Sequence, residues 1–322
     1  MLPISVIYEP IQKDMAEVEE SLRGTGGDDF LWMAEPLRYV VESGGKRIRP
    51  AVTLLVGKFY RCDHERLITL AAAVELFHTG TLVQDDAIDK SAMRRGKPTV
   101  NSLWGEGAAV LLGDYLFAKA SELACSTGSL RVMSSFAETL KHLSSGELRQ
   151  FVSAYDWRME QQEYYKQIES KTASLFSVAS RSAAILGEAP GEEEEAFRTY
   201  GHNLGMAFQI VDDILDFVGE EEELGKPVGN DLLQGTITLP AILLVEQRQG
   251  KPAIREMVQK KGDKVAVERV IDMIRSSDII QECYRIADEF CAQARLALEG
   301  LPQNAYRKSL FDLTRFVIER RK

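Results

Sequence analysis

Apolar residues recur at intervals of three and four along most of the chain, and this spacing is typical of one buried face of an α-helix. The periodicity predicts helices over residues 52–56, 67–83, 108–123 and 197–217. Alternating β-branched runs bounded by Asn-Gly or Asp-Gly turns are nearly absent. Strands are therefore not expected, and the pattern predicts an all-α protein.

Glycine and proline cluster between the periodic segments, where helices are expected to end. These breaks lie at residues 24–27, 44–50, 96–98, 187–191, 225–229 and 250–252. They divide the chain into about ten or more helices, which is typical of a helical bundle. No long stretch of Ser, Gly or Pro separates two cores, so residues 1–322 are expected to form a single helical domain.

The composition is that of a globular protein with a sizeable core, since 45% of the 322 residues are hydrophobic and 27% are charged. The net charge of −10 argues against nucleic acid as the main partner, because phosphate binding needs a clustered excess of Lys and Arg. Binding of an anionic substrate would then depend on a local basic pocket.

The cysteines and the N-terminal segment bear on the compartment. Cys62, Cys125, Cys283 and Cys291 lie far apart without a CxxC pair, so neither a zinc site nor a disulfide framework is expected. The N-terminal segment lacks the basic and apolar regions of a secretory signal. No uncharged apolar run approaches the roughly 20 residues that cross a bilayer, so no transmembrane segment is expected. We therefore expect a soluble cytoplasmic protein, which a greasy product could still bring to a membrane surface.

Two short acidic runs lie at residues 192–195 and 220–223. The first follows Pro190 and Gly191 and is expected to open a helix, where negative charge complements the N-terminal end of the helix dipole. Both runs are predicted to be solvated faces without a catalytic role.

The strongest chemical signal is the segment LVQDDAIDKSAMRRGKP, which contains Asp85, Asp86 and Asp89. Asp85 and Asp89 are four residues apart, so on a helix they share one face and lie about one turn apart. The preceding residues 71–83 are almost wholly apolar and should be buried. Repulsion between these carboxylates is relieved if hard cations compensate it, and oxygen-only ligands select Mg²⁺. Taken alone, the motif could equally be a solvated helix end.

A second cluster repeats this pattern in the segment QIVDDILDF, which contains Asp212, Asp213 and Asp216. Two such clusters on apolar helices are hard to explain as surface decoration. If they face each other across a bundle, they form a negative pocket for several Mg²⁺ ions that bridge to substrate phosphates. That arrangement suits diphosphate as a leaving group.

Basic residues stand in or beside the breaks that flank the aspartate helices. The segment GGKRIRP is a compact cationic turn whose glycines allow close backbone approach, and Lys46 with Arg49 can bind a second anion. The other basic candidates lie just past the first cluster, at a helix start, and in the loop after the second cluster: Arg94 with Arg95, Lys171, and Lys226. Each alone would be surface decoration, but together they favour diphosphate binding.

At these residues the sequence resembles the trans-isoprenyl diphosphate synthases, the polyprenyl synthetase family. The matching blocks, in chain order, are GGKRIRP, ELFHTGTLVQDDAIDKSAMRRGKPT, LLGDYLFAKA, KTASLF and GMAFQIVDDILDF…GKPVGNDLLQGTITLP. The resemblance implies the isoprenoid synthase fold, in which helices surround a large central cavity, and usually a homodimer. One departure is Gln84, where members often carry His before the first aspartate pair.

The resemblance also implies a Mg²⁺ cofactor, with three ions in the active site. Two ions would be held against the allylic diphosphate by Asp85 and Asp89, with Asp86 beside them. A third ion would be held by Asp212, with Asp213 and Asp216 nearby.

The same resemblance assigns substrate contacts. The allylic diphosphate would be bound by Arg94, Lys171 and Lys226, and isopentenyl diphosphate by Lys46, Arg49, His78 and Arg95. The path of the developing cation would be lined by Thr172 and Gln209. His78 lies seven positions before Asp85, two turns back on the same face, which favours a ligand contact over a satisfied core histidine.

These residues predict the condensation of isopentenyl diphosphate with an allylic diphosphate. Cations neutralise the leaving diphosphate, and an apolar cavity keeps water from the allylic cation. No His or Glu is obviously placed as a base, so the departing diphosphate is expected to accept the proton, as in the family. A class I terpene cyclase, a squalene-synthase-like enzyme and a regulatory helical subunit remain as alternatives. The second anion site, the second aspartate cluster and the intact aspartates count against them.

Chain length is expected to be set along the helix that carries Asp85. Thr81 lies one turn below Asp85 on the same stripe, and Gly80 flanks it. Short-chain members of the family commonly carry an aromatic floor at one of these two places, and both are small here. Phe77 is the nearest bulky candidate for a floor. The expected product has at least twenty carbons, with a farnesyl or other short-chain synthase as the alternative.

Overall fold

The computed structural model describes residues 2–25, 31–219, 228–247 and 250–320. Helices make up most of this part of the chain, as predicted. Those of the first half are α1 (Ile4–Ile7), the short η1 (Glu9–Ile11), α2 (Gln12–Gly24), α3 (Leu31–Glu42), α4 (Ile48–Phe59), α5 (His64–Ile88), α6 (Val100–Trp104), α7 (Glu106–Ser126) and α8 (Leu130–Ser153).

The second half continues the helical pattern, and together the described helices exceed the ten predicted. They are α9 (Gln161–Ile168), a π-helical turn η2 (Glu169–Ala173), α10 (Ser174–Leu186), α11 (Gly191–Val218), α13 (Asn230–Leu233), α14 (Leu239–Glu246), α15 (Lys251–Gln259), α16 (Lys264–Arg275), α17 (Ile279–Ala297) and α18 (Ala305–Glu319).

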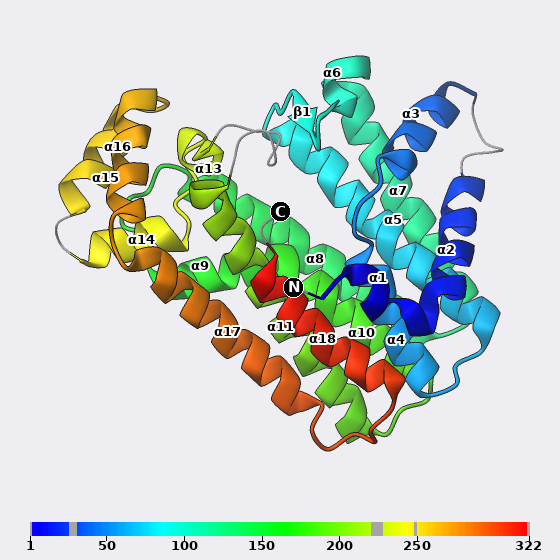
Figure 1. Cartoon of the computed structure of the whole chain (residues 1–322). Helices are drawn as coiled ribbons and strands as arrows, with labels where there is room; N and C mark the ends of the chain where they lie inside the picture. Colours follow the sequence, from blue (N-terminus) through cyan, green and yellow to red (C-terminus); the bar gives the residue numbers. More distant parts are fainter. Residues whose placement is uncertain (1, 26–30, 220–227, 248–249, 321–322) are drawn as a thin grey trace.

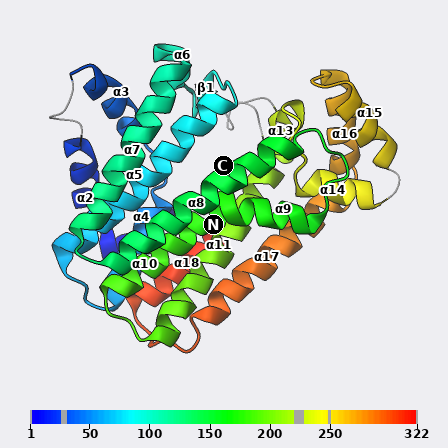
Figure 2. The same cartoon turned by 180° about the vertical axis from the view of Figure 1, so that it is seen from behind.

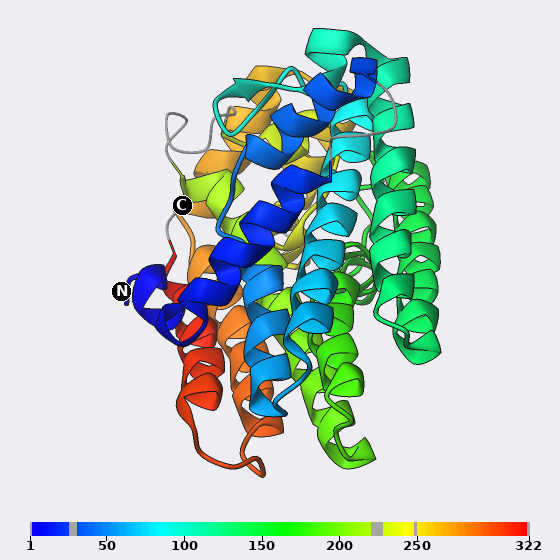
Figure 3. The same cartoon turned by 90° about the vertical axis from the view of Figure 1, so that its right-hand side faces the viewer.

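The long helices α5 and α11 each pack against two neighbouring helices in the core of the molecule. Helix α5 packs against α7 and α4, and α11 packs against α10 and α17. Helices α1 to α3 lie on one side of this core, and α13 to α16 lie at the opposite end (Figure 1). The N-terminal α1 packs beside the C-terminal α18, which also contacts α4 (Figure 3).

Helix α5 carries the first aspartate cluster out of the core. It begins at the N-cap Asp63, whose side chain accepts a hydrogen bond from the backbone N–H of Arg66 at 3.0 Å. Its residues 70–77 are buried on every face. In the described part of the chain, α5 alone is long and apolar enough to span a membrane, but 67% of its most apolar window is buried within the fold. It is thus a core helix that ends in carboxylates.

A small hairpin corrects the expectation that strands are absent. Strands β1 (Met93–Arg94) and β2 (Lys97–Pro98) pair antiparallel through a two-residue turn. Both turn residues, Arg95 and Gly96, have positive φ angles of 51° and 75°. Tight hairpin turns of this hand require such angles. The hairpin is too short to leave an alternating pattern, and it sets the direction of Arg94 and Arg95.

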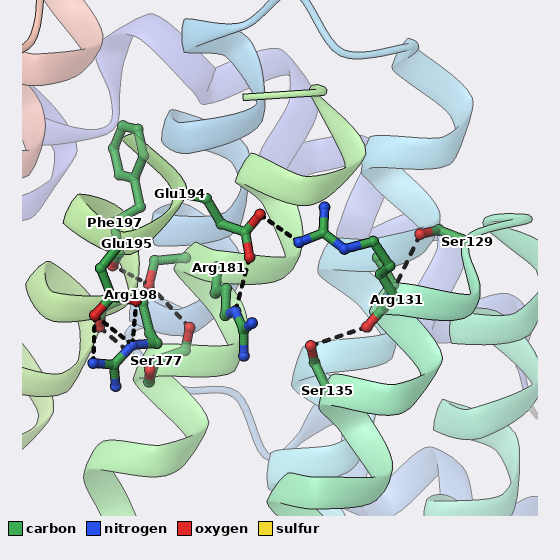
Figure 4. A network of polar contacts seen from close by, with 11 residues as sticks. Ser129, Arg131, Ser135, Ser177, Arg181, Glu194, Glu195, Phe197 and Arg198 are labelled. Carbon is green, nitrogen blue, oxygen red and sulfur yellow. Dashed lines mark hydrogen bonds and ion pairs between the residues drawn. The ribbon is translucent and has the colours of Figure 1, made fainter. Parts of the chain in front are cut away.

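A buried ion network corrects the prediction for the acidic run at 192–195. As expected, these residues open α11. However, Glu194 is only 7% exposed. Its carboxylate forms ion pairs with Arg131 of α8 at 2.7 Å and with Arg181 of α10 at 3.0 Å (Figure 4). The tertiary packing of three helices therefore buries a carboxylate that local sequence predicts to be solvated. The run at 220–223 lies outside the described residues.

Glycines let α11 approach α10 and η2 closely. A Cβ on Gly205 would lie 2.5 Å from the Cα of Ala173, and one on Gly201 would collide with the carbonyl of Phe176. Backbone atoms cannot move aside as a flexible side chain can. The close approach places the π-helical turn beside the second aspartate cluster.

We expect Gly205→Ala to lower the free energy of unfolding by about 1–3 kcal/mol, because overpacking forces backbone shifts. Gly191→Ala is the matched control on the same helix, since a Cβ there meets nothing within 4 Å. Urea denaturation of both variants measures the difference. Equal stability of the two variants would contradict the proposed contact.

Candidate active site

A cavity of about 870 Å³ opens between α4, α5, α7, α8, the π-helical turn η2 and α11. Its volume suits a ligand of substrate size. The charged and polar side chains that line it include Lys46, Arg47, Arg49, Glu75, His78, Gln84, Asp85, Arg94, Arg95, Glu147, Lys171, Thr172, Gln209, Asp212 and Arg320. Residues distant in sequence, including one from each aspartate cluster, thus meet at one site.

The first aspartate cluster divides into three environments. Asp85 lines the cavity, and its carboxylate lies 3.6 Å from the Lys171 ammonium. Asp86 is buried and pairs with the Arg94 guanidinium at 2.8 Å. Asp89 caps the end of α5 and is exposed. Burial raises the pKa of Asp86 and of Asp89, and the Asp85 charge adds to both shifts.

The second cluster sends one carboxylate into the cavity and turns two away. Asp212 lines the cavity and pairs with Arg320 at 2.9 Å. Asp213 and Asp216 are 3% and 1% exposed and do not line it. One oxygen of Asp216 accepts a hydrogen bond from the backbone N–H of Asp231 at 3.2 Å, which ties α13 to α11.

A chain of hydrogen bonds runs from the cavity wall to Asp213. The Thr172 hydroxyl donates to Oε1 of Gln209 at 2.6 Å, and Nε2 of Gln209 donates to Asp213 at 2.7 Å. The other Asp213 oxygen accepts from the Tyr164 hydroxyl at 2.6 Å. Burial raises the pKa of Asp213 to about 8, although both donors favour its ionised form.

The π-helical turn η2 carries Lys171 and Thr172 to the cavity. Insertions of this kind change the direction of side chains along a helix and are common at functional sites. Lys171 lies 2.8 Å from Glu147 of α8. Although burial disfavours its charge, the carboxylates of Asp85 and Glu147 raise the pKa of Lys171. The ammonium is therefore charged at every physiological pH.

The cationic turn before α4 has an unusual backbone that points its side chains into the cavity. Gly44, Gly45 and Arg47 have positive φ angles of 69°, 152° and 48°. Arg47 holds this conformation, because its guanidinium pairs with Glu19 and Glu75, each at 2.6 Å. A Cβ at Gly45 would lie 2.7 Å from the Arg95 guanidinium, so glycine also brings the hairpin close.

Arg49 and His78 form a pair on the cavity wall. Nη1 of Arg49 lies 3.0 Å from Nε2 of His78, and its guanidinium stacks 4.4 Å from the Phe176 ring centroid. Burial lowers the pKa of Arg49 to about 10. Burial, followed by the Arg49 charge, holds the pKa of His78 well below its ordinary value. His78 is therefore neutral and accepts the hydrogen bond.

The carboxylates fit divalent ions that share their ligands with a substrate. The described residues contain no group of three or more His, Cys, Asp or Glu able to hold a metal by themselves. Mg²⁺ is commonly bound by one or two carboxylates, with water and substrate phosphates as its remaining ligands. The single carboxylates of Asp85 and Asp212 at one cavity match that arrangement.

The comparisons with known proteins agree with this geometry. Residues 31–274 match the family model described as polyprenyl synthetase. The chain belongs to the polyprenyl synthetase family. It is 36% identical to heptaprenyl diphosphate synthase component 2 of Geobacillus stearothermophilus, over 99% of both chains. It is 34% identical to octaprenyl diphosphate synthase of Escherichia coli, over 98% of both.

Solved structures of the polyprenyl synthetase family confirm the fold prediction. A decaprenyl diphosphate synthase from Rhodobacter capsulatus superposes with a TM-score of 0.92 at 34% identity, covering 99% of this chain and 100% of that one. A polyprenyl synthase from Caulobacter crescentus, complexed with calcium and isoprenyl diphosphate, gives 0.95 at 32% identity, covering 99% and 98%. The chain is thus an all-helical transferase of this family, as predicted.

Several residues of this polyprenyl synthetase site carried no signal in the sequence. Arg320, Glu147 and Tyr164 belong to no motif, and each reaches the site through packing of a distant helix. Lys226, a predicted diphosphate ligand, lies outside the described residues. Gln84 donates to Asp114 at 3.0 Å, so its amide is held at the cavity wall.

The predicted chain-length positions lie in different environments. Thr81 lines the cavity, as the shared stripe with Asp85 predicts. Gly80 instead faces α7, where a Cβ would lie 3.1 Å from the Phe117 ring. Phe77 is fully buried and does not line the cavity, whereas Phe117 does. The Phe77 ring lies 5.1 Å from that of Phe117 and 5.7 Å from that of Phe136.

Neutral His78 predicts a loss of stability in acid. In the unfolded chain it takes up a proton below pH about 6.5, whereas the folded site resists protonation. The stability from this group is present above that pH and falls by up to about 1.4 kcal/mol per unit below it. Between pH 7.5 and 5.5, His78→Asn should lose about 1 kcal/mol less than the wild type in urea denaturation. Parallel losses would contradict the assignment.

Proposed function

We propose that this polyprenyl synthetase condenses isopentenyl diphosphate with an allylic diphosphate and releases a product of at least twenty carbons. The predicted reaction class is confirmed by the family, whose relatives include heptaprenyl and octaprenyl diphosphate synthases. A farnesyl synthase is disfavoured, because the positions that would carry a floor next to Asp85 are Gly80 and Thr81.

The observation that carries the proposal is one cavity lined by a carboxylate from each aspartate cluster and by two sets of cations. The allylic diphosphate would lie against Asp85 and Asp212, bound by Lys171 and Arg94. Lys171 and Arg94 now pair with carboxylates, so each is already oriented toward the acidic side. We retain Lys226 as a further ligand of this group from the resemblance alone.

We assign the isopentenyl diphosphate to the cationic turn and its neighbours: Lys46, Arg49, His78 and Arg95. All four line the cavity. The Nε–H of Arg49 is buried without a hydrogen-bond partner among the described residues. Such a group is costly to leave unpaired, and a phosphate oxygen would satisfy it. Neutral His78 keeps the Arg49 guanidinium pointed in a fixed direction.

We propose that three Mg²⁺ ions act with the allylic diphosphate, held by Asp85, Asp89 and Asp212. Asp86 would orient Arg94, while Asp213 and Asp216 would position the helix and its loop. The bound ions neutralise charge on the leaving diphosphate. Asp89 lies outside the cavity lining, at the C-terminal end of α5 one turn beyond Asp85.

The protein side chains favour ionisation and protect the cation that it forms. Lys171 neutralises the departing diphosphate. The apolar wall, which includes Leu140, Leu143 and Phe208, excludes water from the allylic carbon. Oxygen atoms of Thr172 and Gln209 face the path of the cation. The double bond of isopentenyl diphosphate then attacks, and the departing diphosphate accepts the released proton.

We further propose a homodimer built on α7 and α8. Both helices lie on one side of the molecule (Figure 2). Exposed apolar side chains follow one face of each, and they include Val110, Leu111, Leu130, Leu148, Phe151 and Val152. Phe151 and Val152 are 75% and 83% exposed, which is unusual for clustered large apolar side chains without a partner.

We also propose that residues 1–322 form one domain of a cytoplasmic enzyme. The packing of α18 on α1 and α4 supports the single domain, because it joins the two ends of the chain. Four free cysteines support a reducing compartment. A terpene cyclase or a coupling enzyme gives no reason for the second set of cations beside the cationic turn.

The direct test incubates the purified chain with Mg²⁺, labelled isopentenyl diphosphate and geranyl, farnesyl or geranylgeranyl diphosphate in turn. We expect extension of at least one primer to twenty carbons or more, abolished by EDTA. Asp85→Ala should lower kcat by at least about 100-fold while leaving the fold intact, since charge stabilisation at the reacting centre contributes that much.

Asp114→Ala is a matched control, because Asp114 is a carboxylate that contacts Gln84 and does not line the cavity. Asp114→Ala should keep most of the activity. Full activity of Asp85→Ala, or cyclic products without consumption of isopentenyl diphosphate, would overturn the proposal. The Geobacillus relative is named as component 2 of its synthase. The assay therefore contains this chain alone, and activity would show that it needs no second component.

Chain length should respond to Phe117, which we propose as the floor of the cavity in place of Phe77. Phe117→Ala should lengthen the product, because it opens the space in front of Phe77. Thr81→Phe should shorten it, because Thr81 lines the cavity. Chromatography of the dephosphorylated products measures both. A longer product from Phe77→Ala, with no change in Phe117→Ala, would show that Phe77 and not Phe117 is the floor.

A further inference from the structure

We propose that Tyr164 is a positioning residue for the reaction. Acting through Asp213, it sets the orientation of the Gln209 amide, so that the oxygen atoms of Gln209 and Thr172 present lone pairs to the cavity. This proposal rests on the proposed function, because lone pairs matter only if a cation forms there.

Tyr164 is remote from the cavity yet connected to it by continuous contacts. It lies on α9, is 2% exposed and does not line the cavity. Its hydroxyl donates to Oδ2 of Asp213 at 2.6 Å, and Oδ1 of Asp213 accepts a hydrogen bond from Gln209 at 2.7 Å. Gln209 and Thr172, the last two residues of this chain of hydrogen bonds, line the cavity.

The direction of these hydrogen bonds follows from which atoms can donate. Oδ1 of Asp213 accepts a hydrogen bond from Nε2 of Gln209, so Gln209 turns its NH₂ group toward Asp213 and its Oε1 the other way. Oε1 then accepts the Thr172 proton at 2.6 Å. With its hydrogen used in this bond, the Thr172 oxygen has its lone pairs left for the cavity. The chain thus ends in electron-rich atoms, which stabilise positive charge.

The Tyr164 hydroxyl completes this arrangement because Asp213 is 3% exposed and has two oxygens to satisfy. Without that donor, one buried oxygen would lack a partner, and a buried acceptor without a partner is unfavourable. The Asp213 side chain could then turn, and that change frees the Gln209 amide to rotate. The alternative is a structural role, in which Tyr164 only fastens α9 to α11.

A double-mutant cycle separates these two roles. We expect Tyr164→Phe to lower kcat for farnesyl diphosphate about tenfold, which is the loss expected from one hydrogen bond. The change in KM should be less than about twofold. Gln209→Met removes the amide through which Tyr164 acts. In that background, Tyr164→Phe should change kcat less than about twofold. Equal losses in both backgrounds, or an unchanged kcat in Tyr164→Phe, would overturn the proposal.

Tyr165→Phe is the matched control. Among the described residues, the Tyr165 hydroxyl donates to Gln161 at 3.3 Å and to no member of the hydrogen-bond chain from Tyr164 through Asp213 and Gln209 to Thr172, here called the relay. Tyr165→Phe should keep the kcat of the wild type. The Mg²⁺ concentration for half-maximal rate should be the same in Tyr164→Phe and wild type, and a large shift would mean that Tyr164 acts on the metal ligands instead.

If Tyr164→Phe does not fold, Asp213→Asn tests the same relay, because its amide can donate to Gln209 and reverse the orientation. It should lower kcat at least as much, and an unchanged kcat would overturn the proposal. An inactive wild type contradicts the proposed function itself. An active wild type with unaffected variants contradicts only the relay.

Discussion

The structure depends on bringing two sets of like charges to one cavity. Asp85 on α5 and Asp212 on α11 are carboxylates that line this cavity, and repulsion between like charges opposes such a gathering. Cations offset it, since Lys171 and Arg320 lie 3.6 and 2.9 Å from them. In the proposed reaction, the substrate diphosphate with its metal ions would exchange with these partners.

The cationic turn faces the opposite constraint, because it gathers positive charge. Arg47 offsets part of this positive charge by pairing with Glu19 and Glu75. This ion network holds a backbone with three positive φ angles. The pairing leaves Lys46 and Arg49 directed at the cavity. Within one short motif, Arg47 therefore holds the backbone, while Arg49 is left for the proposed anion site.

Helix packing gives this electrostatic arrangement its precision. Gly201 and Gly205 let α11 meet α10 and the π-helical turn without a gap, and Glu194 joins α8 to both helices (Figure 4). Thr172 and Gln209 can therefore bond directly at 2.6 Å. Because packed interiors resist small displacements, the hydrogen-bond chain behind the cavity stays in register with the carboxylates in front of it.

The sequence by itself determined the helices, both aspartate clusters and the cationic turn, because periodicity and short motifs are local. It also indicated that His78 and Thr81 share a face with Asp85, since a helix repeats every 3.6 residues. It did not indicate that Asp213 turns away, that Phe117 rather than Phe77 lines the cavity, or that Arg320, Glu147 and Tyr164 bond to residues of the two clusters and their partners. Tertiary structure decided these, because a helix's own repeat says nothing of which neighbour covers each face. Burial and partner charges arise only when helices distant in sequence pack together.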